Sequence, residues 1–261
     1  MRVCAIQMTV EKGDRAANHA AVRRLAAEAV TRCAPDVIVL PELWSTGYAL
    51  ERAAELASSD GLKDAAFLGA LARELGVAFA GGSVLASRGG RVFNRAQVVD
   101  SKGRYVAGYD KIHLFRLMDE DKFLAAGDAP QWFNLGGMRC SSVICYDIRF
   151  CELPRLLAVG GAEVLFVSAE WPDPRTEHWR TLLRARAIEN QMFVAACNRC
   201  GETEGTVFAG YSALIAPDGT VLAEAGSGEE IIWADFDADA LRRTREIIPV
   251  FQDRVPELYA K

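Results

Sequence analysis

Residues 138–170 read MRCSSVICYDIRFCELPRLLAVGGAEVLFVSAE, two apolar runs separated by an amphipathic one. Met138 to Cys145 and Glu163 to Glu170 have the length and composition of buried strands, and Phe150 to Val159 is predicted to form a short helix. Gly160-Gly161 fits the end of that helix. A strand, a helix and a second strand in this order are typical of an α/β domain.

The same alternation of short apolar and longer amphipathic segments continues in both directions along the chain. Further strands are expected at Arg2 to Met8, Asp36 to Leu40, Val77 to Leu85, Arg91 to Asp100, Tyr105 to Lys111, Met192 to Asn198, Ala209 to Ile215, Val221 to Ala225 and Ile231 to Asp235. Further helices are expected at Asn18 to Arg32, Leu62 to Leu75 and Arg175 to Gln191. No linker interrupts this pattern, so we expect one α/β domain over residues 1–261, with two sheets and helices outside them.

The composition is that of an ordinary globular protein. Of 261 residues, 51% are hydrophobic and 25% are charged, which excludes a disordered or collagen-like chain. The net charge of −5 disfavours a general nucleic-acid partner, because such proteins are usually basic. The longest unbroken apolar run, Met192 to Cys197, is of strand length and too short to cross a membrane. The N-terminus lacks a signal-peptide pattern, so we expect a cytoplasmic protein whose seven cysteines are reduced.

Three polar side chains are expected where predicted strands end, which is where α/β proteins bind their ligands. They are Glu42, which follows a strand through Pro41, Lys111 and Cys145. A carboxylate, an amine and a thiol in one crevice would suit acyl transfer, in which the thiol attacks, the carboxylate moves the proton and the ammonium stabilises the oxyanion. Taken singly, each has a simpler explanation: a buried small side chain, a helix cap or a solvated amine.

Two other arrangements could use a thiol. A Cys–His pair would need one of His19, His113 and His178, and no papain-like or caspase-like sequence surrounds any cysteine. Cys197 and Cys200 form a CxxC, but zinc would require two more ligands and no second pair exists. The sequence therefore favours structural thiols at 197 and 200.

Three segments carry a family resemblance: PELWSTGY (41–48), YDKIHLF (109–115) and ICYDIRF (144–150). They resemble the signature blocks of the nitrilase, or carbon–nitrogen hydrolase, superfamily. The resemblance implies a four-layer αββα sandwich and a catalytic triad of Glu42, Lys111 and Cys145. A second glutamate of the family precedes a Gly-Asp pair, which is residues 127–128 here, and this places it at Glu120.

Three more segments resemble the bacterial ω-amidase branch, the 2-oxoglutaramate amidases: HLFRLMDE (113–120), SAEWPDPRTEHW (168–179) and RARAIENQMFVAACNR (184–199). This implies hydrolysis of the side-chain amide of a 2-oxo acid monoamide, 2-oxoglutaramate or 2-oxosuccinamate, through a Cys thioester. Neither a metal nor another cofactor is implied. Cys151 departs from the family pattern, which has Pro after the Arg-Phe pair.

The resemblance also implies roles for the site residues. Lys111 is expected to lower the pKa of Cys145 so that the thiol becomes a thiolate. Glu42 is expected to accept the thiol proton and pass it to the departing ammonia. The oxyanion would be held by Lys111 and the backbone N–H of Tyr146, and Glu120 would orient Lys111.

The substrate pocket is less well defined by the sequence. A substrate carboxylate suits a guanidinium, which binds it through two hydrogen bonds. Arg149 is the first candidate, although it could instead pair with Asp147 or Glu152. Further candidates for the pocket are Arg116, Arg175, Tyr48 and Trp171.

Other functions remain open at this stage. Another carbon–nitrogen hydrolase would act on an N-carbamoyl group or a nitrile, and a non-catalytic interaction protein could share the fold. The expected partner is a small-molecule amide, with no nucleic acid and no membrane. Family members commonly form dimers or larger assemblies, and the segment Ile247 to Lys261 could pack on a partner or on its own subunit; its apolar anchors are Pro249, Phe251 and Tyr259.

Overall fold

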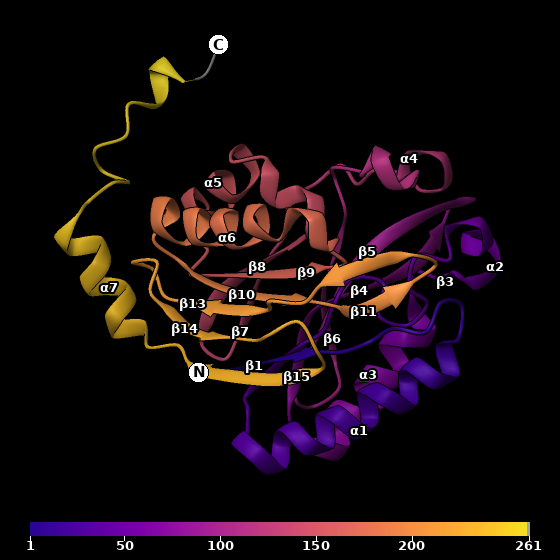
Figure 1. Cartoon of the computed structure of the whole chain (residues 1–261). Coiled ribbons are helices and arrows are strands. Elements are labelled where there is room, and N and C mark those ends of the chain that lie inside the picture. Colours follow the sequence, from indigo (N-terminus) through magenta and orange to yellow (C-terminus); the bar gives the residue numbers. More distant parts are fainter. Residues whose placement is uncertain (260–261) are drawn as a thin grey trace.

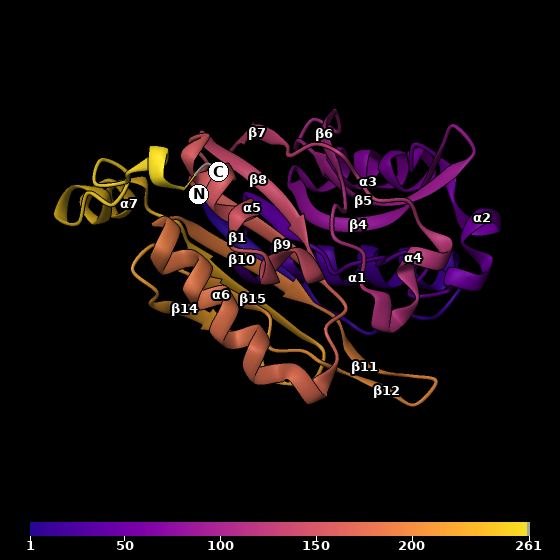
Figure 2. The ribbon, with the colours of Figure 1, turned by 90° about the horizontal axis from the view of Figure 1, so that it is seen from above.

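The computed structural model describes residues 1–259, in which two β-sheets stack face to face between two layers of helices (Figure 1). The first sheet contains, in spatial order, β15 (Glu230–Asp235), β1 (Arg2–Gln7), β2 (Val37–Val39), β4 (Ala78–Arg88), β5 (Arg91–Val99) and β6 (Tyr105–Asp110), with β3 (Ser58–Ser59) paired to β4. The second contains β14 (Val221–Glu224), β13 (Ala213–Ile215), β10 (Phe193–Asn198), β9 (Val164–Ala169), β8 (Met138–Ile144) and β7 (Trp132–Leu135). A separate hairpin projects from the body in Figure 2 and consists of β11 (Cys200–Thr203) and β12 (Thr206–Ala209).

Each sheet has helices on its outer face. The first is covered by α1 (Arg15–Cys33) and α3 (Leu62–Leu75), and the second by α5 (Glu152–Val159) and α6 (Thr176–Asn190). The remaining helices are α2 (Ala53–Leu56), α4 (Glu120–Phe123) and α7 (Ala238–Ile247). The predicted four-layer αββα sandwich is confirmed.

The central strands are buried on both faces, which explains their continuous apolar sequence. In β1, Val3 and Ala5 face the second sheet, and Cys4 and Ile6 face α1 and α3. This alternation follows from the two-residue period of a strand. Three apolar layers result, one between the sheets and one under each pair of helices.

The inner strands of both sheets run parallel, so their carboxyl ends meet at one edge. In the first sheet β1, β2 and β4 are parallel neighbours, and in the second β8, β9 and β10 are. Because residues just beyond such ends lie close together, this edge brings distant parts of the chain to one place.

Some elements differ from the prediction. The strand expected at Ala209 to Ile215 is two strands, β12 and β13, because Gly210 and Tyr211 have positive φ angles of 72° and 50° and turn the chain between them. The strands β3, β7 and β11 and the helices α2, α4 and α7 were not predicted. Helix α7 buries only Leu241 and is rich in charged residues, so it offers few of the apolar residues on which the prediction relied.

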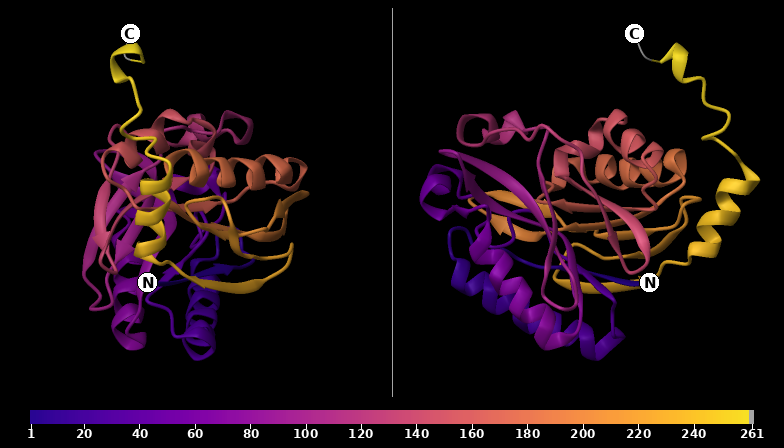
Figure 3. Two further views of the ribbon diagram at one scale, coloured as in Figure 1. Left: turned by 90° about the vertical axis from the view of Figure 1, so that its left-hand side faces the viewer. Right: turned by 180° about the vertical axis from the view of Figure 1, so that it is seen from behind.

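The C-terminal segment leaves the sandwich after α7 (Figure 3). Phe251 packs against the layer under α5 and α6, with the guanidinium groups of Arg155 and Arg245 at 5.8 and 5.2 Å from its ring. Large apolar side chains along this segment are exposed to solvent: Ile247, Ile248, Val255, Leu258 and Tyr259. Residues 260–261 of the expected tail lie outside the described residues.

Among residues 1–259, every helix is too short or too polar to cross a membrane.

Candidate active site

The three residues singled out at strand ends lie at the shared carboxyl edge of the two sheets. Glu42 follows β2, Lys111 follows β6 and Cys145 follows β8. A backbone bond joins the sheets at this edge, because the N–H of Glu42 donates to the carbonyl of Ala169 at the end of β9, 3.4 Å away. The side chains of Glu42 and Lys111 are fully buried, and Cys145 is 4% exposed.

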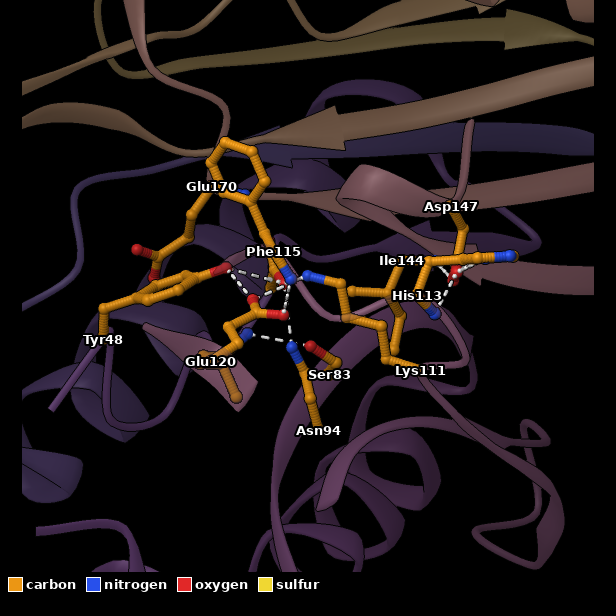
Figure 4. Close-up of polar contacts among 12 residues, drawn as sticks. Tyr48, Ser83, Asn94, Lys111, His113, Phe115, Glu120, Ile144, Asp147 and Glu170 are labelled. Carbon is orange, nitrogen blue, oxygen red and sulfur yellow. Dashed lines mark hydrogen bonds and ion pairs between the residues drawn. The ribbon is translucent and has the colours of Figure 1, made fainter. Parts of the chain in front are cut away.

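Lys111 lies between two carboxylates (Figure 4). Its Nζ atom is 2.7 Å from Oε1 of Glu42 and 2.7 Å from Oε1 of Glu120. Burial opposes the charged amine, but the two carboxylates hold the pKa of Lys111 well above its usual value. An ammonium has three donors, so one remains for another acceptor.

The Glu42 carboxylate accepts hydrogen bonds on both oxygens. Oε1 accepts from Lys111, from Nδ2 of Asn94 at 2.8 Å and from the Tyr48 hydroxyl at 3.0 Å. Oε2 accepts from the backbone N–H of Glu170 at 2.9 Å. These contacts come from four separate segments and hold the carboxylate in one orientation.

Glu120 is held as firmly as Glu42. Its Oε2 accepts from the backbone N–H of Phe115 at 2.8 Å, and its Oε1 is bonded to the Tyr48 hydroxyl as well as to Lys111. Burial raises the pKa of Glu120, although Lys111 opposes the shift. Tyr48 was expected to wall the pocket, and its hydroxyl instead lies in the carboxylate cluster.

Cys145 begins a short 3₁₀ turn and has a left-handed φ of 45°. Burial and the charge of Glu42 raise the pKa of its thiol well above the usual value, and the opposing effect of Lys111 is smaller. Lys111 thus acts in the expected direction, but burial and Glu42 outweigh it. A thiol whose pKa is raised needs a base to remove its proton when it reacts.

Asp147 connects the turn at Cys145 to the segment that carries Lys111. Its fully buried carboxylate accepts from the backbone N–H of Ile144 at 2.9 Å, from the Tyr109 hydroxyl at 2.8 Å and from the backbone N–H of His113 at 3.0 Å. The 3₁₀ turn that begins at Cys145 and the segment after β6 are therefore held by the same carboxylate.

The histidines are engaged elsewhere. Nδ1 of His113 lies 2.8 Å from Asp147, and its ring stacks on Phe150 at 3.7 Å. His19 contacts Asp64, and His178 contacts Arg149. These contacts give a Cys–His pair at Cys145 no support.

A narrow cavity opens at Cys145. Arg149 stacks over Trp171 at 4.6 Å and Arg175 stacks over Phe115 at 5.6 Å, and all four residues line the cavity. Within residues 1–259 neither guanidinium forms an ion pair with a carboxylate. Burial and the positive charge of Arg175 lower the pKa of Arg149.

The two carboxylates considered as alternative partners of Arg149 form hydrogen bonds with other groups. Asp147 serves the backbone and His113, as described above, and Glu152 accepts from the thiol of Cys151. Arg116 lies farther out: its side chain is 86% exposed and it lines a neighbouring cavity that shares Phe115 with the first.

The CxxC cysteines are apart from the site. Cys197 is fully buried, its thiol is 3.1 Å from the carbonyl of Ile6, and burial raises its pKa. Burial raises the pKa of Cys200 to about 11. Both are free thiols, as are the other five cysteines.

Several residues of the cluster were not singled out from the sequence. Asn94, Glu170 and Arg199 are buried polar residues. Glu170 ends one predicted strand of the second sheet and Arg199 directly follows another, which is the same signal that identified Glu42. Asn94 lies inside β5, and nothing in its local sequence distinguishes it.

A buried carboxylate–lysine–carboxylate cluster beside a cysteine, at the edge of an αββα sandwich, defines a hydrolase of the carbon–nitrogen class. The family model described as carbon-nitrogen hydrolase matches residues 2–246, and the chain belongs to that family.

The comparisons with individual proteins narrow the class to the ω-amidase branch. The chain is 48% identical over 224 residues to the 2-oxoglutaramate amidase of Bacillus subtilis, covering 86% of each chain. It is 39% identical over 220 residues to omega-amidase YafV of Escherichia coli K12, covering 84% of each. A solved variant of the amidase from Nesterenkonia sp. AN1, with acrylamide added at its active-site cysteine, superposes with a TM-score of 0.87 at 28% identity, covering 99% of this chain and 98% of that one. The chain is thus a carbon–nitrogen hydrolase that acts on amides.

Proposed function

We propose that the protein hydrolyses the side-chain amide of a small 2-oxo acid monoamide, 2-oxoglutaramate or 2-oxosuccinamate, through a thioester on Cys145. The observation that carries this proposal is the position of Lys111, fully buried between Glu42 and Glu120 beside a buried thiol. The relative named 2-oxoglutaramate amidase supports the choice of substrate.

In the acylation step Glu42 takes the proton of Cys145 as sulfur attacks the amide carbon. The carbonyl oxygen becomes an oxyanion, which the free donor of Lys111 and the backbone N–H of Tyr146 stabilise. The tetrahedral intermediate collapses, the C–N bond breaks, and the proton on Glu42 passes to the leaving nitrogen as ammonia departs. Because burial raises the pKa of the thiol, this step depends on the base.

In the deacylation step water attacks the thioester, with Glu42 again as base. The C–S bond breaks, the proton returns to sulfur and the carboxylic acid leaves. Glu120 acts by holding Lys111 in place. The overall reaction consumes only the amide and water, and side chains of this protein carry out the proton transfers.

The substrate carboxylate is assigned to Arg149, with Arg175 beside it. Both line the cavity at Cys145 without an ion-pair partner among residues 1–259, and guanidinium groups over aromatic rings suit a carboxylate. Trp171 and Phe115 support these two arginines. Arg116 is exposed in the neighbouring cavity and lies 4.0 Å from Asp121, so Arg149 and Arg175 are the preferred candidates for this role.

Ammonia release from a small panel tests the proposed function: 2-oxoglutaramate, succinamate, a nitrile and an N-carbamoyl amino acid. We expect 2-oxoglutaramate to be turned over fastest. Preference for the N-carbamoyl compound or the nitrile would assign the chain to another carbon–nitrogen hydrolase reaction, and no release from any of them would contradict the proposed function.

We also propose that two copies of this single-domain chain associate as a homodimer, with a second copy covering the C-terminal segment. The support is the exposed apolar series from Ile247 to Tyr259, next to a Phe251 that is anchored on its own subunit. Sedimentation of the full chain should give a dimer, and Ile248→Asp with Leu258→Asp should shift it toward the monomer. A wild-type monomer at micromolar concentration would overturn the assignment.

A further inference from the structure

A second buried ion pair lies behind the general base. Glu170 directly follows β9 and Arg199 directly follows β10, and these parallel strands are neighbours in the second sheet. Nη1 of Arg199 is 3.1 Å from Oε2 of Glu170. The two side chains are 0% and 1% exposed, so the pair is shielded from water.

Glu170 is attached directly to Glu42. Its backbone N–H donates to Oε2 of Glu42 at 2.9 Å, and this is the bond that holds the oxygen not used by Lys111. The orientation of that N–H depends on where the chain at the end of β9 is held. The carbonyl of Ala169 accepts from the N–H groups of both Glu42 and Arg199, so base and arginine share one anchor in the backbone as well.

Arg199 extends this anchor to the hairpin. Its Nη2 donates to the carbonyl of Val10 at 3.0 Å and to the Thr203 hydroxyl at 2.9 Å, and its guanidinium lies 4.1 Å from the centre of the Phe208 ring. Thr203 is in β11 and Phe208 is in β12. The arginine therefore joins the end of β9 to the N-terminal segment and to both strands of the hairpin.

We propose that Glu170 and Arg199 are a positioning pair, which fixes the carboxylate of Glu42 for proton transfer by anchoring the backbone at the end of β9. This inference rests on the proposed role of Glu42 as the base. Neither residue touches the reacting atoms. They act through Glu42, so their loss should lower kcat and leave substrate binding nearly unchanged.

Burial opposes a charge on Glu170, and Arg199 is the main group that favours it. Burial raises the pKa of Glu170 to about 8, Arg199 opposes this, Glu42 adds to it and Lys111 opposes it. Oε1 of Glu170 is buried without a hydrogen-bond partner among the described residues. Burying a charged group costs free energy, and we expect such a group where its ion pair fixes a geometry. Removing either Glu170 or Arg199 leaves the charge of the other uncompensated.

The test is a double-mutant cycle in ammonia release between Arg199→Lys and Glu42→Gln. Lysine keeps the charge but cannot reproduce the bonds of the guanidinium to Glu170, Val10 and Thr203. Alone, Arg199→Lys should lower kcat by about tenfold and change KM by less than about twofold. In the Glu42→Gln background the same change should lower kcat by less than about twofold, because the group that it positions is already gone.

Arg245→Lys is the matched control, because Arg245 is another partly buried arginine that donates to carbonyl groups far from the site. It should leave both backgrounds unchanged. Equal losses for Arg199→Lys in the two backgrounds, or a loss confined to KM, would overturn the positioning role.

If Arg199→Lys lowers the unfolding temperature so far that the protein is not folded in the assay, Glu170→Gln replaces it in the same cycle. Glutamine keeps the side-chain shape and the backbone N–H and removes the charge that holds Arg199. A smaller loss with the same dependence on Glu42 is expected, and independence of Glu42 would overturn the inference. Failure of the proposed function is a separate outcome, because it would appear as normal ammonia release from Cys145→Ala.

Discussion

The carboxylate cluster and the wall of the adjacent cavity use charge in opposite ways. In the cluster, Lys111 has a carboxylate on two sides, and Glu42 has four hydrogen-bond donors. In the cavity wall, Arg149 and Arg175 have aromatic rings behind them and no carboxylate among the described residues. The charges of the cluster are therefore paired without substrate, and the guanidinium groups of the cavity wall are not paired with a carboxylate of the described residues.

This difference separates the parts of the site that perform chemistry from those that select a substrate. Preorganised charges need no rearrangement during the reaction, and that is what makes them effective in stabilising an oxyanion. Unpaired guanidinium groups gain most when an anion arrives, so their energy depends on which substrate is bound. The comparison predicts that substitutions in the cluster lower turnover on every amide and that substitutions in the wall change selectivity.

The largest effect is expected at the nucleophile. Cys145→Ala removes the covalent route and should lower turnover by at least about a thousandfold on all substrates, measured as ammonia release. Cys151→Ala, Cys197→Ala and Cys200→Ala are the controls and should leave turnover nearly intact. Near-normal release from Cys145→Ala would show that the cluster is not the catalytic centre.

The next effect concerns proton transfer within the cluster. Glu42→Gln keeps the shape of the side chain but removes the base, so acylation should slow by roughly a hundredfold or more. Lys111→Ala should also slow it through loss of oxyanion stabilisation, and Glu120→Gln should do less because it only displaces Lys111. Mass spectrometry of the acyl-enzyme after rapid mixing measures the step, and a normal rate of its formation in Glu42→Gln would exclude Glu42 as the first base.

A selective loss is expected in the cavity wall. Arg149→Met should reduce kcat/KM for 2-oxoglutaramate by roughly a hundredfold and affect propionamide, which lacks the carboxylate, far less. The two enzymes and two substrates form a two-by-two comparison, with Arg116→Met as the matched control. Equal losses on both substrates would make Arg149 structural, and the carboxylate would have to bind elsewhere.

The smallest effect concerns the thiol itself. The negative charge of Glu42 raises the pKa of Cys145, so Glu42→Gln should lower that pKa and shift the pH dependence of iodoacetamide alkylation toward lower pH. At neutral pH the thiolate fraction should rise. The measurement uses a Cys151→Ser background, because Cys151 is the exposed thiol, and Glu51→Gln on the surface serves as control. An unchanged pH profile of alkylation would show that Glu42 does not influence the pKa of the Cys145 thiol.

The outcome for individual residues shows which predictions local sequence could support. Glu42, Lys111 and Cys145 each end a strand, and strand ends are visible as the limit of an apolar run. The pKa of Cys145 depends on burial and on Glu42 as well as on Lys111, and neither of the first two is apparent from neighbours in the chain. Asn94 could not be found at all, since it is one polar residue in an alternating strand and only pairing of β5 with its neighbours carries it to Glu42.

The positions of the tyrosine and the arginines show the same limit. Tyr48 and Arg149 were both expected near the pocket, but the hydroxyl of Tyr48 joins the two carboxylates and Arg149 remains without one. Sequence distance from the nucleophile does not distinguish these outcomes. The difference arises from which loop covers which edge of the sandwich.

The amino-acid sequence alone determined the α/β class, the order of most elements, the four-layer architecture through family resemblance, and the residues at the ends of the parallel strands. These features depend on periodicity and short segments, which act over a few residues. The tertiary structure alone decided that Lys111 is held between two carboxylates, that burial and Glu42 raise the pKa of Cys145, and that Glu170 and Arg199 stand behind the base. Those features depend on burial and on contacts between separate segments of the chain, such as Glu42 with Lys111 and with Glu170, and they exist only once the two sheets have packed together.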